Sequence, residues 1–316
     1  RTVSLMDYKI HFAPLQGYTD AVYREVHHRI FGGVENYYTP FVRVEKDGFR
    51  NKDIRDIAPD RNSETPVIPQ LIAATPDEFR RLAALFREKG YRQADINMGC
   101  PYPMQARLHR GAGILPFVEE AEALLQTIRE FPEMNFSVKL RLGWNAPDEV
   151  FALLPVMNSL RLAHVTLHPR IGTQQYKGNV DTDSFARFYE ACRHPLFYNG
   201  DLNSLEDIDR ILCRFPRLAG VMLGRGLLSS PWLAAEYAVA GNGFTDEEKK
   251  AKLLHFHTLL FEKYSSALEG GDHQILAKMK TLWDYLLPEA EKRLRKKILK
   301  SNQLPTYLQA VKELLQ

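Results

Sequence analysis

Residues 67–98 read VIPQLIAATPDEFRRLAALFREKGYRQADINM, and this stretch holds one complete strand–helix–strand unit. Residues 67–72 and 94–98 are short runs rich in apolar residues, as in β-strands that are buried on both faces. Between them, residues 76–88 repeat apolar positions with a helical period, and Thr75 and Pro76 are typical of a helix start. The stretch therefore predicts two parallel strands joined by a helix.

The same alternation runs through the first three quarters of the chain. We expect eight strands, at residues 11–15, 36–41, 67–72, 94–98, 137–142, 163–168, 196–199 and 220–223. Further helical periods occur at 117–129, 147–160 and 205–215. Eight such repeats predict an α/β fold, a (β/α)8 TIM barrel of roughly 250 residues. A doubly wound open sheet is the structural alternative.

The rest of the chain predicts a small all-α helical bundle. The sequence GNGFT at 241–245 is a loop signal, and helical periods follow at 246–268, 274–287, 289–300 and 305–315. We therefore expect two domains, a barrel over residues 1–243 and a helical domain over residues 245–316.

Charge is nearly balanced over the whole chain but not within it. The 316 residues include 42 Lys and Arg against 39 Asp and Glu, which excludes a histone-like protein and a polyanionic tail. Residues 1–244 carry 29 basic and 29 acidic side chains, and residues 245–316 carry 13 and 10. Between residues 278 and 300, eight basic side chains stand against three acidic ones. Such a segment is either a solvated helix face or a phosphate-binding surface.

Composition also limits the location and the metal chemistry. No window reaches the ~18 apolar residues of a membrane span, and the first ten residues do not read as a secretory signal, so we expect a cytoplasmic protein without a membrane partner. Cys100, Cys192 and Cys213 are far apart with no CxxC, which argues against disulfides and a metal site. Cys192 and Cys213 lie in helical patterns among apolar residues, and we expect them to be packing residues.

Polar side chains recur at the carboxyl ends of the predicted strands, where (β/α)8 barrels build their sites. Each one alone has a structural interpretation as a loop or core residue, but seven strands share the feature. These residues are Gln16, Gln70, Asn97, Cys100, Lys139, Arg141, His168, Arg170, Asn199, Asp201 and Arg225, and Gly224 precedes the last of them.

Lys139 is the most informative of these residues, because a lysine within the strand sequence SVKLRL would point into the barrel. An unpaired ammonium there is costly, so Lys139 must meet an anion or be neutral. Two interpretations remain open: a Schiff-base lysine, or a cation that faces an electron-rich cofactor or a phosphate.

Two other features bear on the chemistry. The sequences NGD at 199–201 and GRG at 224–226 place glycines after strands seven and eight, the usual phosphate corner of such barrels. No GxGxxG sequence opens a βαβ unit, so a dedicated Rossmann domain is not expected. Cys100 lies in a loop between Gly99 and Pro101, which suits a nucleophile or a proton donor.

Seven motifs together resemble the tRNA-dihydrouridine synthase family in order and spacing. They are FAPLQGYTD at 12–20, DINMGCP at 95–101, RGAG at 110–113, VKLRLG at 138–143, LHPR at 167–170, YNGD at 198–201 and VMLGRG at 221–226. The similarity runs over about residues 12–233 and continues weakly into KMKTLWDY at 278–285.

The resemblance implies an FMN barrel joined to a helical domain, which reduces the C5–C6 bond of particular uridines in tRNA with NADPH. It implies hydride transfer from flavin N5 to C6 and a proton from Cys100 to C5. It further implies that the cofactor is bound by Pro14, Leu15, Gln16, Gln70, Lys139, His168, Asn199, Gly200, Asp201, Gly224 and Arg225. It places Asn97 and Arg170 toward substrate or flavin, and we expect Asn97, Arg141 and Arg170 to contact the tRNA substrate. We expect the protein to be a monomer, and the resemblance implies tRNA as its partner. We expect Lys278, Lys280 and Trp283 to contact the tRNA, while Trp283 and Tyr285 are either stacking or core residues.

The sequence departs from the family pattern at two places near the predicted substrate and flavin sites. Pro103 and Met104 stand where some relatives have two lysines, and Pro169 replaces a commoner glycine. The sequence CPYP at 100–103 favours the branch that acts on tRNA position 16. The alternatives are an FMN-barrel reductase of a free pyrimidine or small enone, and an RNA-binding protein without catalysis.

Overall fold

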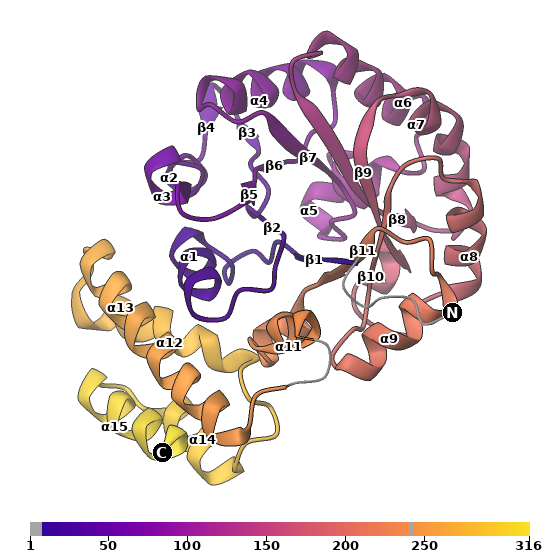
Figure 1. The fold of residues 1–316 in the computed structure, drawn as a ribbon. Helices are drawn as coiled ribbons and strands as arrows, with labels where there is room; N and C mark the ends of the chain where they lie inside the picture. Colours follow the sequence, from indigo (N-terminus) through magenta and orange to yellow (C-terminus); the bar gives the residue numbers. More distant parts are fainter. Residues whose placement is uncertain (1–7, 240–242) are drawn as a thin grey trace.

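The computed structural model describes residues 8–239 and 243–316, and most of the former form a parallel β-barrel surrounded by helices (Figure 1). The sheet has the order β5-β2-β1-β11-β10-β9-β8-β7-β6, and every neighbouring pair is parallel. Its strands are β1 (Lys9–Phe12), β2 (Asn36–Tyr38), β5 (Val67–Ile68), β6 (Gln70–Leu71), β7 (Gln93–Met98), β8 (Asn135–Gly143), β9 (Leu162–Ile171), β10 (Leu196–Asn199) and β11 (Gly220–Leu223).

The two ends of this sheet meet at Pro69. The strand predicted at 67–72 consists of β5 and β6, which are interrupted by Pro69 because proline has no N–H to donate. β5 pairs with β2 on one side and β6 pairs with β7 on the other, so the eight predicted strands close on themselves. The (β/α)8 barrel is therefore confirmed, and the open sheet is excluded.

Helices cover the outside of the barrel and bury their apolar faces against it. In α4 (Pro76–Glu88), the Thr75 hydroxyl accepts a hydrogen bond from the Glu78 amide, and Phe79, Leu82 and Phe86 are buried. The other covering helices are α1 (Ala21–Ile30), α6 (Val118–Gln126) with η2 (Thr127–Glu130), η3 (Glu149–Leu153) with α7 (Leu154–Ser159), α8 (Thr182–Ala191), α9 (Leu205–Arg214), α10 (Arg225–Ser229) and α11 (Leu233–Ala238).

Two connections after barrel strands are irregular. Between β2 and β5 the chain forms a small hairpin and two short helices, and after β7 it forms one short helix and a 3-10 turn. These elements are β3 (Val44–Glu45), β4 (Gly48–Phe49), α2 (Asn51–Asp56), α3 (Pro59–Asn62), α5 (Pro103–Ala106) and η1 (Gly111–Ile114). Irregular loops at this end of a barrel are where binding sites form.

The helical region after the barrel is also confirmed, and it lies beside α1 and α11 in Figure 1. It consists of α12 (Asp246–Ala267), α13 (Gly271–Thr281), η5 (Leu282–Asp284), α14 (Lys292–Lys300) and α15 (Leu304–Leu315). Thr245 and Glu248 form a capping box at the start of α12. Residues 241 and 242 of the predicted loop lie outside the described residues. Within the described ranges, no helix has both the length and the hydropathy to cross a membrane.

The two cysteines expected to pack have different environments. Cys192 ends α8 and packs half-buried against the core. Cys213 of α9 is exposed, so its predicted packing role is wrong. The buried face of α9 consists of Ile208, Ile211 and Leu212. Each residue of a helix is rotated by about 100° from the one before it, so Cys213 points away from that face.

Candidate active site at the carboxyl end of the barrel

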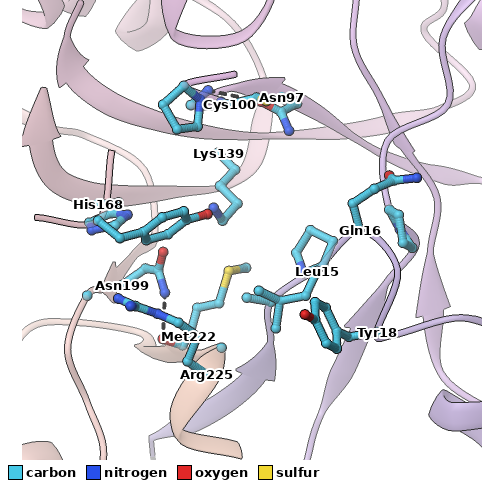
Figure 2. Close-up of a pocket in the computed structure, with 18 of the residues that line it drawn as sticks. Leu15, Gln16, Tyr18, Asn97, Cys100, Lys139, His168, Asn199, Met222 and Arg225 are labelled. Carbon is cyan, nitrogen blue, oxygen red and sulfur yellow. Dashed lines mark hydrogen bonds between the residues drawn. The ribbon is translucent and has the colours of Figure 1, made fainter. Parts of the chain in front are cut away.

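One cavity of about 290 Å³ opens at the carboxyl ends of the barrel strands (Figure 2). It gathers residues from loops that are far apart in the sequence. The predicted residues among its lining are Pro14, Leu15, Gln16, Gln70, Asn97, Cys100, Lys139, Arg141, His168, Asn199, Gly200, Asp201, Gly224 and Arg225. Arg170, Lys278, Lys280 and Trp283 are not part of this lining.

Cys100 lies in a tight turn that follows β7, and two neighbours fix this turn. The Asn97 side-chain oxygen accepts hydrogen bonds from the amides of Gly99, at 3.0 Å, and Cys100, at 2.9 Å. Gly111 lies against the turn with a φ of 63°, and a Cβ atom there would lie 2.7 Å from the Cys100 carbonyl oxygen. The RGAG motif therefore needs glycine at position 111 both for its backbone conformation and for this close approach.

The environment of Cys100 keeps its thiol protonated. Burial raises the pKa of the Cys100 thiol above its ordinary value. A hydrogen bond with the Tyr102 backbone and the cations Lys139 and Arg141 oppose this shift only in part. A thiol of this kind is a poor nucleophile at neutral pH but retains a proton to donate.

Lys139 projects from β8 into the cavity (Figure 2). Among the described residues, none accepts a hydrogen bond from its ammonium or forms an ion pair with it. Burial, with a contribution from Arg141, lowers the pKa of Lys139 to about 8, and Asp95 opposes the shift. Lys139 is therefore mostly charged at neutral pH, as a cation that faces an electron-rich group must be.

Arg141 and Tyr176 form another wall of the cavity. The Arg141 guanidinium donates hydrogen bonds to the carbonyl oxygens of Ile171, at 3.1 Å, and Gln175, at 2.5 Å. It lies 5.2 Å from the centre of the Tyr176 ring, and Arg225 lies 4.6 Å from the same ring. Tyr176 is half exposed, so its ring reaches the cavity between two cations.

Arg170 uses all of its donors inside the protein. Its Nη1 donates to His168 Nε2 at 2.9 Å and to Asp201 at 3.1 Å, and its Nη2 donates to Asp201 at 2.6 Å and to the Gly178 carbonyl at 2.7 Å. Its Nε donates to the Lys177 carbonyl. Because an arginine has five N–H groups, none is left for tRNA. The predicted substrate contact of Arg170 is wrong, and the side chain, only 2% exposed, positions His168 and Asp201 instead.

The hydrogen bond from Arg170 determines the tautomer of His168, and its surroundings determine its charge. Because arginine can only donate, His168 Nε2 must accept and the ring carries its proton on Nδ1. Burial and the nearby cations Arg141 and Lys139 also hold the pKa of His168 well below its ordinary value. His168 is therefore a neutral ring in the wall of the cavity.

The loops after β10 and β11 form the predicted phosphate corner. The Asn199 side chain donates to the Met222 carbonyl at 3.0 Å, which ties the two loops together. Gly200 has a φ of 141°, and a Cβ atom there would lie 3.1 Å from the His168 ring. Arg225 lies 3.5 Å from the Asp201 carboxylate, so this corner holds a guanidinium beside a carboxylate.

The lining also includes side chains without a predicted role, among them Tyr18, Tyr176 and Met222, and it includes Tyr285, which the sequence predicts to stack or to pack in the core. Tyr18 lies inside the quoted motif at 12–20, and Tyr285 ends the weak match at 278–285, so the motifs carried a signal for both. Tyr285 follows η5, so the helical region contributes directly to the cavity.

The residues expected to contact tRNA have different surroundings. Trp283 is 1% exposed and donates to the Tyr307 hydroxyl at 3.0 Å, so a stacking role is wrong and the side chain belongs to the core. Lys278 pairs with Asp20 at 2.9 Å, and Lys280 donates to the Ser301 carbonyl at 2.9 Å. Their contact with tRNA stays a prediction.

Three other lysines of the basic segment are free. Lys292, Lys296 and Lys300 of α14 are exposed, and within the described part of the chain they form no ion pair. They are four residues apart, which puts them on one face of the helix at intervals of about 6 Å.

A second cleft, of about 800 Å³, lies between the barrel and α12 and α13. It shares Gln16 and Pro40 with the cavity that contains Cys100, so the two hollows adjoin. Its basic residues are Lys52, Arg55, Arg61 and Lys278, and its acidic residues are Asp20, Asp53, Asp56 and Glu269.

Comparison with known structures supports the barrel. Morphinone reductase has a TM-score of 0.52 at 9% identity, over 77% of this chain and 90% of that protein. A variant of NCR from Zymomonas mobilis also has a TM-score of 0.52, at 13% identity over 75% of this chain and 88% of the other. At these identities the similarity shows the fold alone.

Comparison of sequences identifies the family. Residues 11–315 match the family described as dihydrouridine synthase (Dus). A tRNA-dihydrouridine(16) synthase of Pseudomonas putida is 30% identical over 74% of this chain and 75% of that protein. A tRNA-dihydrouridine(16) synthase of Ralstonia nicotianae is 30% identical over 70% of both. The chain therefore belongs to the dihydrouridine synthase family and is a flavin-dependent oxidoreductase that reduces uridines in tRNA.

Proposed function

We propose that the chain reduces the C5–C6 bond of uridine 16 in tRNA, with FMN as the bound flavin and NADPH as the reductant. The names of the relatives from Pseudomonas putida and Ralstonia nicotianae support position 16, as does the CPYP sequence at 100–103. FMN and NADPH rest on the family resemblance. A cytoplasmic monomer with residues 245–316 as a tRNA-binding domain is part of the same proposal.

The chemistry of the cavity fits FMN. The free ammonium of Lys139 would face the electron-rich part of the flavin ring, and His168 would lie in the wall beside it. Gly200, Gly224 and Arg225 would hold the phosphate at the loops after β10 and β11, with Asn199 keeping the two loops together. Pro14 and Leu15, which follow β1, would support the ring.

The chemistry that a bound flavin supplies is hydride transfer to C6 of the uracil ring. Cys100 then has one task, to hold a proton and donate it from its sulfur to C5. Its raised pKa suits that task, because the thiol stays protonated over the neutral range. Asn97 keeps the sulfur in place through the two backbone amides of the turn. Arg141, with a pKa lowered to about 10 by burial, remains a cation at neutral pH and faces the same cavity.

The observation that carries this proposal is the pairing of a protonated thiol with an unpartnered ammonium in one cavity. Lys139 supplies positive charge where a reduced cofactor needs it, and Cys100 supplies a proton where the substrate needs it. A reductase of free enones needs no surface for nucleic acid, and the family match over residues 11–315 decides against it.

For tRNA we propose two contact surfaces. The first is the cleft between the barrel and α12 and α13, which adjoins the cavity at Gln16. The second is the face of α14 that presents Lys292, Lys296 and Lys300. A uridine must leave its stack to enter the cavity, at a cost of a few kcal/mol, and phosphate contacts on both surfaces would offset that cost.

The test is to map dihydrouridine in tRNA from cells that lack the gene, before and after the gene is restored. We expect dihydrouridine to disappear at position 16 and to return with the parent gene, while other positions keep theirs. Loss at a different position would overturn the assignment to position 16. Unchanged dihydrouridine at every position would overturn the proposed function.

A further inference from the structure

Asp95 is a buried acid below the cavity that the proposed chemistry does not use. It lies on β7, with Gln70 of β6 and Ser137 of β8 as its partners in register. Its side chain is fully buried and does not line the cavity. One layer above it, Asn97 is in register with Lys139. A buried carboxylate needs partners, and the hydrogen bonds around Asp95 show which partners it has.

A chain of hydrogen bonds runs from the Cys100 turn down to Asp95. The amides of Gly99 and Cys100 donate to the Asn97 side-chain oxygen. The Asn97 side-chain nitrogen donates to the Gln70 oxygen at 2.9 Å. The Gln70 side-chain nitrogen in turn donates to Asp95 Oδ2 at 2.8 Å. The chain therefore connects the proton donor of the proposed mechanism to a buried acid.

The upper end of this chain fixes the direction of every bond in it. Backbone amides can only donate, so Asn97 must present its oxygen to them and its nitrogen to Gln70. Gln70 must then present its own nitrogen to position 95, which needs an acceptor there. Ser137 donates to the other oxygen of Asp95 at 2.5 Å. Because both carboxyl oxygens accept hydrogen bonds, the arrangement suits an ionised Asp95.

An ionised Asp95 supplies the negative charge that Lys139 otherwise lacks. Lys139 has no ion pair among the described residues, and it is faced by Cys100, Arg141 and His168 besides Asp95. Arg141 lowers the pKa of Lys139, and Asp95 and Cys100 raise it. Because the Cys100 thiol is itself neutral at neutral pH, Asp95 is the acid that acts on Lys139 in that range.

We propose that Asp95 is a positioning residue for both sides of the cavity: its charge keeps Lys139 protonated, and its oxygen anchors the amide chain that holds the Cys100 turn. The role of Lys139 toward the flavin rests on the proposed function, but the coupling of Asp95 to Lys139 does not. Two substitutions separate the charge from the hydrogen bonds. Asp95→Asn removes the charge and, by turning its nitrogen toward Ser137, keeps an acceptor for Gln70. Ser137→Ala removes a hydrogen bond from the same carboxylate and keeps the charge.

The coupling is measured by a titration of Lys139. Lysines labelled with ¹³C by reductive methylation are followed by NMR against pH, and the Lys139 signal is the one missing in Lys139→Arg. In the parent protein we expect a main step near pH 8 and a smaller step near pH 6, where Asp95 titrates. In Asp95→Asn the small step should vanish and the pKa of Lys139 should fall by about one unit. In Ser137→Ala the main step should stay in place.

Either of two outcomes would overturn the proposal: an unchanged Lys139 titration in Asp95→Asn, or a parent Lys139 signal that shows no second, acid-side step at any pH at which the protein stays folded. The second outcome is measured on the parent protein, so the proposal can still be tested if Asp95→Asn fails to fold. The pH profile of tRNA reduction gives an independent readout, and its alkaline limb should move to lower pH in Asp95→Asn by the same amount. If the parent reduces no tRNA, the proposed function fails while the titration still decides the role of Asp95.

Discussion

The Tyr18 hydroxyl donates a 2.9 Å hydrogen bond to Asp284, which joins the first barrel loop to the helical region at the rim of the cavity. The Tyr18 ring also meets Tyr285 edge to face, with 5.1 Å between the ring centres. Burial and the Asp284 carboxylate raise the pKa of Tyr18 to about 12, so the hydroxyl stays a donor at any working pH. The helical region is therefore part of the cavity wall and not only an attachment to the barrel.

Tyr18→Phe removes this hydrogen bond and keeps the ring. We expect the free energy of unfolding to fall by about 1 kcal/mol and the KM for tRNA to rise several-fold, because the helical region is held less firmly. Tyr91→Phe is the matched control, since the Tyr91 hydroxyl donates to the Ile57 carbonyl at 2.7 Å and does not line the cavity. Urea unfolding and steady-state kinetics measure both effects. Equal KM values in the two variants would contradict this role of Tyr18.

Gly111→Ala tests the support of the Cys100 turn. The new methyl group would lie 2.7 Å from the Cys100 carbonyl oxygen, at a backbone φ of 63°. Gly90→Ala is the control, because Gly90 has a φ of 91° and nothing within 4 Å of the added Cβ atom. Both variants should lose about 1 kcal/mol of stability to the left-handed backbone.

Only Gly111→Ala should lose a further 1–3 kcal/mol or so to the clash, and about tenfold or more in the rate of uridine reduction. Single-turnover kinetics with saturating tRNA give that rate. A rate within twofold of the parent, in a variant that shows the stability loss, would mean that the position of the Cys100 turn does not govern the chemical step.

Charge reversal on α14 tests the second tRNA surface. The triple variant Lys292→Glu, Lys296→Glu, Lys300→Glu should bind tRNA more weakly, and the slope of log affinity against log salt should fall by about 2 to 3. The control reverses Arg92, Arg161 and Arg193, which lie near the amino-terminal ends of β7, β9 and β10 and are exposed. A filter-binding titration at several salt concentrations measures both. A salt slope equal to that of the parent would show that α14 does not contact phosphate.

The sequence pattern was sufficient for the barrel because its signals are local. Apolar runs predict the eight strands, helical periods predict the helices between them, and all the polar residues predicted at strand ends except Arg170 line one cavity. The division of one strand at Pro69 follows from the missing N–H of proline, but its consequence, that the sheet closes there, depends on pairing with β2 and β7.

The remaining features depend on contacts between distant residues. Nothing near Trp283 in the sequence shows that Tyr307 accepts its N–H inside the helical region. Likewise, the donors of Arg170 are used by Asp201 and by carbonyls of a loop that has no motif. Tyr176 reaches the cavity from that same loop. A motif indicates which residues meet, whereas the direction and the partners of each side chain require the folded chain.

The claim that Cys100 protonates the substrate is tested most directly by Cys100→Ala, with the exposed Cys213→Ala as the control. Flavin content, the rate of flavin reduction by NADPH and the rate of uridine reduction are measured in both variants by absorbance and single-turnover kinetics. Cys100→Ala should keep the first two and lose uridine reduction by about 10²–10⁴-fold, since it lacks the proton donor. Uridine reduction at the parent rate in Cys100→Ala would contradict the account.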